Sequence, residues 1–166
     1  RLMDLKRNLY NGCQECSCCN NKCIFHSIPC GSVNAKVMVI NKMPTQYEAC
    51  RMHSMSDKNG TFLSLILQKM NVKRDSIYIT DMIKCNAQLD EHSYNECINH
   101  YLKQEIDIVS PSFILCNGIS VLKACIKAGI FTSLPSQVAY GNIYSTGSFN
   151  VMAMYDLETV LQKTGD

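Results

Sequence analysis

Four cysteines combine a residue type and a spacing that could hold a metal centre. Cys13 and Cys16 form a Cys-x-x-Cys pair, Cys85 directly follows a predicted strand, and Cys97 lies near the start of a predicted helix. Thiolates are the soft ligands that zinc and iron-sulfur clusters require. The set therefore predicts a metal centre that ties an N-terminal arm to the body of the protein.

Other cysteines leave the choice of ligands open. The arm over residues 13–30 is rich in cysteine and turn residues and has no helical or strand period, and it also contains Cys18, Cys19, Cys23 and Cys30. In the alternative interpretation, Cys97 is a small core residue and not a ligand. Cys116 and Cys125 lie on inward faces and are predicted to be core residues of this kind.

The elements that must position these thiols alternate between strand and helix patterns. Short continuous apolar runs at 36–40, 77–80 and 113–116 are typical of strands buried on both faces of a parallel sheet. Apolar residues at helical spacing occupy 62–70 and 94–109 between these runs. The pattern predicts an α/β fold with a short, mostly parallel sheet flanked by helices.

Several end signals set the expected boundaries. Ser93 and Glu96 form a capping-box pattern, which predicts a helix start there and puts Cys97 in the first turn. A further helix is expected to end at Gly129. Two strands are predicted around 147–148, and Asp156 is the predicted N-cap of a closing helix over 157–163. We expect one domain over 1–166.

Composition narrows the classes of protein. The chain has 166 residues, 46% of them apolar, which is enough for one sizeable core. The net charge of +2 lacks the strong basic excess of many nucleic-acid-binding proteins. There is no signal peptide or transmembrane pattern, and the 11 cysteines are an odd number, so we expect an intracellular protein, cytoplasmic or nuclear and not secreted, with no membrane contact.

Several segments together resemble the family-four uracil-DNA glycosylases, the iron-sulfur branch of their superfamily. They are Cys13-x-x-Cys16, residues 35–40, Ser76-Ile-Tyr-Ile-Thr-Asp-Met-Ile-Lys-Cys85, Glu96-Cys97, Tyr101-Leu-Lys-Gln104 and Ser110-Pro111. The resemblance implies a three-layer fold with an N-terminal cysteine-rich, cluster-binding arm. It also implies that Cys13, Cys16, Cys85 and Cys97 hold a 4Fe-4S cluster, with zinc as the alternative.

The positions that match the family's pocket carry different residues. Lys42 stands where the family has an acidic residue, and only Pro44 of that glycine-rich motif is retained. Met55 falls near the aromatic residue that stacks on the flipped base, Asp81 replaces the asparagine that reads the base edge, and Asp156 replaces the histidine of a His-Pro motif. The resemblance thus implies that Met55, Asp81 and Pro44 contact substrate, and that Asp81, Asp156 and Lys42 are the candidate catalytic residues.

These replacements have chemical consequences. Cleavage of an N-glycosidic bond leaves negative charge on the departing base, which a carboxylate at Asp156 opposes. Lys42 acts as a base or as a Schiff-base nucleophile only where its amine is neutral, and a solvated lysine or a Lys42–Asp156 ion pair is the ordinary alternative. An ionised Asp81 only accepts hydrogen bonds, which suits the amino group of cytosine, whereas its ordinary role is capping or pairing in a disused pocket.

Two functions follow as hypotheses. The first is a non-catalytic module that keeps the fold and the cluster for binding DNA or for docking into a replication or repair assembly, without ordinary uracil excision. The second is an active DNA glycosylase of base excision that removes cytosine or a modified cytosine. Exposed apolar surface around Met43, Met52, Met55 and Tyr47 would favour docking. A closed pocket with Asp81 at its floor would favour the enzyme.

Contact with DNA phosphates is expected from polar residues of the loops around this pocket. The near-neutral charge predicts an affinity that is modest and sensitive to salt. The candidate residues are Ser54, Ser56, Lys58, Asn59, Lys84, Ser145 and Thr146.

Overall fold

The computed structural model describes residues 1–10, 13 and 26–164. Within them, six strands form one sheet in the order β1-β3-β2-β4-β6-β5. The four inner strands are parallel to one another, and the two edge strands are antiparallel to their neighbours. The strands are β1 (Cys30–Gly31), β2 (Val37–Asn41), β3 (Tyr78–Asp81), β4 (Phe113–Asn117), β5 (Ile143–Ser145) and β6 (Asn150–Met154).

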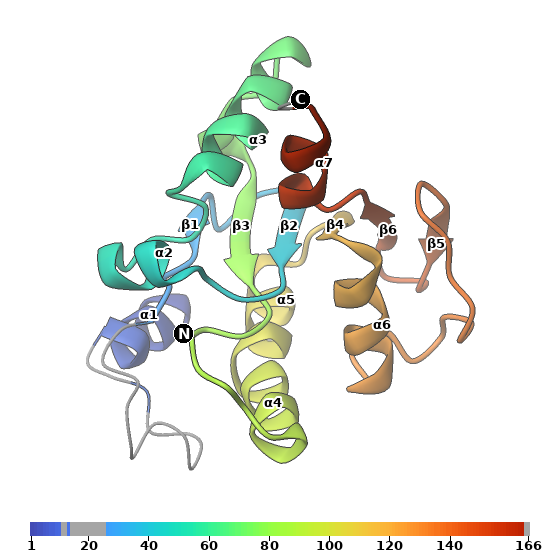
Figure 1. Ribbon diagram of the computed structural model, residues 1–166. Helices are drawn as coiled ribbons and strands as arrows, with labels where there is room; N and C mark the ends of the chain where they lie inside the picture. The colour runs from blue at the N-terminus through green and yellow to red at the C-terminus, as the bar shows by residue number, and fades with distance from the viewer. Residues whose placement is uncertain (11–12, 14–25, 165–166) are drawn as a thin grey trace.

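Helices cover both faces of this sheet (Figure 1). Helices α3 and α7 pack on one face, while α1, α4, α5 and α6 pack on the other. A π-helical segment, η2, joins α4 to α5, and a short 3-10 turn, η1, precedes β3. The helical elements are α1 (Leu2–Tyr10), α2 (Gln46–Arg51), α3 (Lys58–Lys69), η1 (Arg74–Ser76), α4 (Glu91–Cys97), η2 (Ile98–Leu102), α5 (Lys103–Val109), α6 (Ile119–Lys127) and α7 (Leu157–Thr164).

The central residues of the inner strands are mostly apolar because each strand contributes to two cores. In β2, Met38 and Ile40 belong to the core that includes α4 and α6, and Val39 between them belongs to the core with α3 and α7. Successive side chains of a strand point to opposite faces, so two covered faces require an apolar residue at every position. The predicted three-layer α/β fold with a mostly parallel sheet is confirmed.

The predicted start of the second long helix is wrong. The helix begins at Glu91, and the N-cap is Asp90, whose side chain accepts a hydrogen bond from the Ser93 backbone N–H at 2.8 Å. Ser93 is buried inside the first turn and is not the cap. Cys97 consequently lies at the end of α4, next to the π-helical segment, and not in a first turn.

The predicted cap of the last helix is correct. Asp156 accepts a hydrogen bond from the Thr159 backbone N–H at 3.0 Å, immediately before α7. The two predicted strands around 147–148 are β5 and β6, which pair antiparallel. The sequence patterns did not predict α1, α2 or β1.

A buried ion pair connects the end of β3 to α5. The Lys84 ammonium lies 2.9 Å from the Glu105 carboxylate, and both side chains are almost fully shielded from solvent. Lys84 also donates to the Thr80 hydroxyl at 2.6 Å and to the Asp81 backbone carbonyl at 2.7 Å. These bonds hold the loop after β3 in place, because a buried charge without its partner is costly.

Replacement of Glu105 by alanine should therefore destabilise the protein by about 3–5 kcal/mol, since it leaves the Lys84 ammonium buried and uncompensated. The measurement is the free energy of unfolding by urea titration. Glu91→Ala is the matched control, because Glu91 pairs with Lys127 at the surface and its loss should change stability much less than the loss of Glu105 does. Equal effects of the two variants would contradict the structural role of the buried pair.

Candidate functional site

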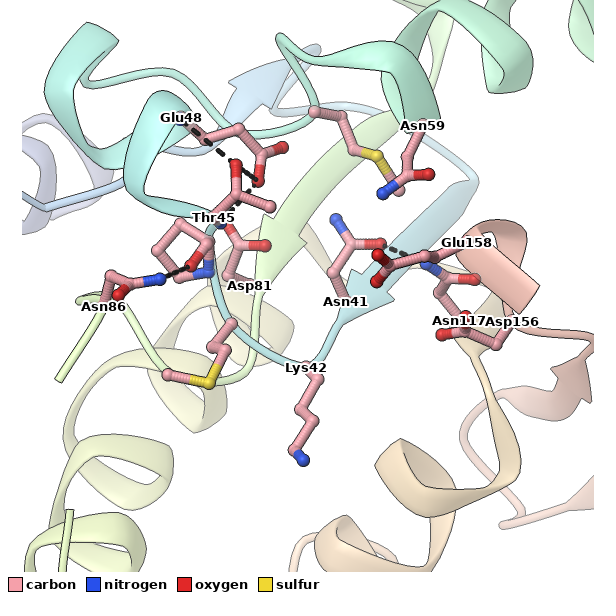
Figure 2. A pocket seen from close by; sticks show the side chains of 13 residues that line it. Asn41, Lys42, Thr45, Glu48, Asn59, Asp81, Asn86, Asn117, Asp156 and Glu158 are labelled. Atoms are coloured by element: carbon pink, nitrogen blue, oxygen red, sulfur yellow. Dashed lines mark hydrogen bonds between the residues drawn. The ribbon is translucent and has the colours of Figure 1, made fainter. Parts of the chain in front are cut away.

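The inner parallel strands end at one edge of the sheet, and three of them end in a polar residue. Asn41, Asp81 and Asn117 are the last residues of β2, β3 and β4, and Asp156 follows the end of β6 closely. Ligands of open α/β sheets bind outside the carboxyl ends of the strands. A pocket of about 250 Å³ lies there, lined by Asn41, Lys42, Met43, Pro44, Thr45, Glu48, Met55, Asn59, Asp81, Asn86, Asn117, Asp156 and Glu158 (Figure 2).

The structure brings all five predicted pocket residues together. They come from three separate parts of the chain, and each of them lines this one cavity: Lys42, Pro44, Met55, Asp81 and Asp156. Their positions agree with the sequence-based prediction of a single site, while their chemical roles stay predictions.

Asp81 forms part of the pocket floor and is buried, with 1% of its surface exposed. One carboxylate oxygen, Oδ2, accepts a hydrogen bond from the Ser27 hydroxyl. The other, Oδ1, has no hydrogen-bond partner among the described residues. Burial raises the pKa of Asp81 above its ordinary value, and this rise is opposed by Ser27, Ser54, Lys84 and Asn41.

Glu48 provides a second buried carboxyl in the same pocket, which the sequence analysis missed. Its Oε2 atom accepts from the Thr45 backbone N–H at 2.8 Å and from the Thr45 hydroxyl at 3.0 Å. The Thr45 hydroxyl in turn caps the Glu48 backbone, so the pair forms the capping box of α2. The Thr45-x-x-Glu48 spacing was the available signal. Burial raises the pKa of Glu48, and the nearby Asp81 and Asp57 carboxylates add to this rise.

Two asparagine side chains connect the strand ends to α7. Asn117 Oδ1 accepts from the Leu157 backbone N–H at 3.0 Å, and Asn117 Nδ2 donates to Asn41 Oδ1 at 3.1 Å. Because the Asn41 oxygen is bound in this way, its NH₂ group is directed into the pocket (Figure 2). The cavity thus presents the Asn41 amide donor beside the two buried carboxyls, Asp81 and Glu48.

Met55 forms part of the wall where the resemblance places a base-stacking aromatic residue. It is buried, and its backbone has a positive φ of 53°. Its carbonyl accepts from Arg74 Nη2 at 2.7 Å and lies so close to α3 that a Cβ on Gly60 would be 1.8 Å from the carbonyl oxygen. The wall position of Met55 therefore depends on the absence of a side chain at Gly60.

Lys42 and Asp156 do not form the ion pair that was one expectation. Lys42 is exposed and its side chain points away from Asp156, and no ion pair between them occurs in the described part of the chain (Figure 2). Asp156 instead uses Oδ1 to cap α7, accepting from the backbone N–H and the hydroxyl of Thr159. Its carboxylate stays close to the cavity without a compensating cation from Lys42.

Some of the expected DNA contacts are wrong. Lys84 and Ser54 are buried, so neither can reach a phosphate at the surface. The Thr146 hydroxyl is occupied, since it accepts from the Phe149 N–H and donates to the Phe149 carbonyl.

The exposed apolar surface that would have favoured docking does not form around Met43, Met52, Met55 and Tyr47. Met55 is buried, and Met43 and Met52 are partly buried, so Tyr47 alone of the four is well exposed, at 52%. A concave pocket with the buried Asp81 is present instead, which is the feature that favours the enzyme over the docking module.

The predicted cluster ligands are described only in part. Cys13, Cys85 and Cys97 are buried and belong to the same hydrophobic cluster. Cys16, with Cys18, Cys19 and Cys23, lies outside the described residues. Within residues 1–10, 13 and 26–164, no three potential ligands are placed to hold a metal ion.

The predicted core cysteines behave as expected. Cys116 and Cys125 are fully buried, and burial raises the pKa of Cys125 to about 12. Both thiols are consequently held in their neutral form. Cys30 is half-buried, with its thiol 3.8 Å from the Ser54 carbonyl oxygen.

The comparisons with known proteins identify the family. The model of the uracil DNA glycosylase superfamily matches residues 28–165, so the chain belongs to this superfamily. It is 26% identical over 131 residues to a type-4 uracil-DNA glycosylase of Pyrobaculum aerophilum, covering 75% of this chain and 66% of the relative. It is 21% identical over 95 residues to a type-4 uracil-DNA glycosylase of Thermotoga maritima, covering 55% and 50%.

A relative of type 5 has about the same sequence identity to this chain as the type-4 relatives have. A type-5 uracil-DNA glycosylase of Pyrobaculum aerophilum is 25% identical over 156 residues, which covers 82% of this chain and 67% of the relative. The matches to the type-4 relatives span only about half to two thirds of those proteins.

The buried carboxyls predict a pH-dependent stability. A carboxyl whose pKa is higher in the folded state binds more protons there, so stability falls as the pH rises from the ordinary pKa through the raised one. Asp81→Asn removes the free-energy cost of burying an ionised carboxylate. We expect the variant to be more stable than the wild type at pH 7, by on the order of 1–3 kcal/mol. The difference should shrink as the pH falls toward 3.8, the ordinary value for Asp.

Urea unfolding at several pH values measures this difference. Asp75→Asn, at an exposed carboxyl on η1, is the control and should change stability by less than about 0.5 kcal/mol throughout. An Asp81→Asn variant less stable than the wild type at pH 7 would show that the carboxylate stabilises the fold.

Proposed function

We propose that the pocket binds a single unpaired nucleobase of DNA, that Asp81 contacts the edge of that base, and that the chain does not carry out ordinary uracil excision. The observation that carries the proposal is the buried Asp81, which lines a cavity of the uracil DNA glycosylase superfamily fold and whose Oδ1 atom has no hydrogen-bond partner among the described residues. A volume of about 250 Å³ is below the roughly 300–1,000 Å³ of pockets for drug-sized ligands, which suits one small planar ring.

The hydrogen-bonding groups favour a base with an amino group. An ionised Asp81 accepts only, so it matches the exocyclic NH₂ of cytosine, while the Asn41 NH₂ donates to a ring nitrogen or a carbonyl. A protonated Asp81 would offer one donor and one acceptor, as an asparagine does. Because burial raises the pKa of Asp81, the base preference is expected to change with pH.

The charges around the pocket oppose ordinary uracil excision. Four carboxyl side chains line the pocket: Glu48, Asp81, Asp156 and Glu158. Lys42 is the one ammonium group among its described lining residues. A departing uracil carries negative charge, which is stabilised by donors or cations and opposed by carboxylates. Asp156 occupies the position that in the resembling family carries the histidine donor, and its carboxylate adds to this opposition.

The test compares binding and excision on oligonucleotides that differ at one base. We expect no abasic product from uracil, and tighter binding of an unpaired cytosine than of an unpaired uracil at pH 7. Asp81→Asn should bind uracil more tightly than cytosine, with a change of roughly tenfold or more in the ratio of the two affinities. The reason is that an amide offers the donor and the acceptor that uracil needs.

Asp75→Asn is the matched control and should bind as the wild type does. Efficient uracil excision by the wild type would contradict the proposal, and so would a base preference that Asp81→Asn leaves unchanged.

A second candidate function is excision of cytosine or a modified cytosine. The observation in its favour is the pair of buried carboxyls with raised pKa, since a neutral carboxylic acid can protonate a leaving group. The C1′–N1 bond would break with its electron pair moving to the base, Asp81 or Glu48 would give the base a proton, and water would add to C1′ with loss of a proton. An abasic product from cytosine that Glu48→Gln abolishes would support this function.

We also propose that Cys13, Cys16, Cys85 and Cys97 hold a 4Fe-4S cluster, with zinc as the alternative. Burial of the three described thiols in one cluster of side chains, and the thiolate chemistry of such centres, support the assignment. The cluster would fasten the N-terminal arm to the body of the protein. Cys85→Ser should lower the iron and sulfide content of anaerobically purified protein to a small fraction of the wild-type content.

Cys116→Ser is the matched control for this loss, because Cys116 is equally buried but belongs to the core. It should retain the metal. Zinc in place of iron and sulfide would select the alternative, and metal retained by Cys85→Ser would exclude Cys85 as a ligand.

DNA is thus the proposed partner, and a protein of a replication or repair assembly is a further proposal from the resemblance. In the described part of the chain, no helix has both the length and the apolar character needed to cross a membrane.

A further inference from the structure

Two exposed tyrosines stack on each other beside the pocket. The ring centroids of Tyr140 and Tyr155 are 4.7 Å apart, and the ring planes differ by 18°. Their exposed fractions are 39% and 68%. Tyr155 directly precedes Asp156, which lines the pocket, so the pair lies at the same carboxyl edge of the sheet.

Backbone contacts fix the segments that carry the two rings. Tyr140 forms an isolated parallel bridge with Ala153 of β6, and the Gly141 N–H donates to the Ala153 carbonyl at 2.9 Å. Tyr155 lies in the two-residue connection between β6, which ends at Met154, and α7, which begins at Leu157. The aromatic surface is thus preorganised, so a ligand that stacks on it does not have to order it first.

The segment that carries this pair has no charged residue before Asp156. Residues 129–155 include no Asp, Glu, Lys, Arg or His, although four carboxyl residues line the adjacent pocket. A DNA strand that places a base in the pocket is repelled by those carboxylates and not by the tyrosine segment. Because no cation of that segment can bind a phosphate, stacking on the two rings is the main attraction that it offers to DNA.

We propose that Tyr140 and Tyr155 form a stacking platform for a second unpaired base of single-stranded DNA, adjacent to the base in the pocket. The platform rests on the proposed base-binding function and extends it from one base to two neighbouring bases. Every base has a π face, and aromatic side chains bind bases of any sequence by stacking on it. The faces of a base are open to such contact where the strand is single and locally unstacked.

The test uses a single-stranded oligonucleotide with one cytosine and the fluorescent base 2-aminopurine next to it. Wild-type protein should quench the 2-aminopurine on binding, because the base stacks on a tyrosine. Tyr155→Ala should lose most of this quenching and bind roughly 5- to 100-fold more weakly. Tyr155→Phe keeps the ring and should behave as the wild type does.

Salt dependence separates stacking from ionic contact. The slope of log Kd against log salt should be the same for Tyr155→Ala and the wild type, since the substitution removes no contact to a phosphate. Tyr47→Ala is the matched control, because Tyr47 is 52% exposed on α2 and packs with Arg51 outside the pocket. It should leave affinity and quenching unchanged.

The outcomes distinguish the platform from the base-binding function. If Tyr155→Ala has the same oligonucleotide affinity and the same 2-aminopurine quenching as the wild type, the platform is overturned. The base-binding function is not contradicted by that result. If the wild type binds no oligonucleotide, both are overturned. Tyr140→Ala provides a second variant, which should weaken binding in the same direction if circular dichroism reveals that Tyr155→Ala is misfolded.

Discussion

The main constraint on this molecule is that parallel strands buried on both faces end together at one edge of the sheet, beside a pocket. Their last residues, Asn41, Asp81 and Asn117, are polar and shielded from solvent, so each polar atom must bond within the protein or face a cavity. Asn117 is bonded to α7 and to Asn41, whereas Asp81 has a partner for one carboxylate oxygen among the described residues. We propose that the remaining oxygen and the Asn41 amide contact a ligand in this pocket.

Burial of ionisable side chains lowers the stability of the fold unless their charges are paired. The Lys84–Glu105 pair offsets its own desolvation by direct contact and orients the backbone at Asp81. Asp81 and Glu48 have no cation in direct contact in the described structure, and their raised pKa values express that cost. Groups of this kind concentrate at functional sites, because a ligand can supply the partner that the protein does not.

The sequence predicts the layers of the fold well and the local chemistry less well. The apolar runs locate β2, β3 and β4 to within a residue, because strands buried on both faces leave no other pattern. The predicted helix start at Ser93 was wrong because Asp90 and Ser93, three residues apart, are both typical N-cap residues. Asp90 forms the cap. Glu48 was missed, since the Thr45-x-x-Glu48 box caps a helix of only six residues with no period of its own. The tyrosine platform joins Tyr140 to Tyr155 through tertiary contact, which no local pattern shows.

Lys84 illustrates the limit of reading charge from sequence. Because this lysine follows a strand near the expected pocket, we predicted that it contacts phosphate. Its ammonium is instead paired with Glu105 on α5. Only the fold reveals that pairing. The same holds for Asp156, whose helix cap was predicted correctly but whose effect on the pocket depends on the position of Lys42.

We propose that the buried Asp81 carboxyl faces the pocket and contacts a bound base. Carbon-13 NMR of labelled aspartate would follow its titration directly, with and without a single-stranded oligonucleotide that contains cytosine. The account predicts a pKa above 3.8 in the free protein and a change in the Asp81 signal on binding that an oligonucleotide without cytosine does not reproduce. An Asp81 that titrates at or below 3.8 and is indifferent to the oligonucleotide would contradict it.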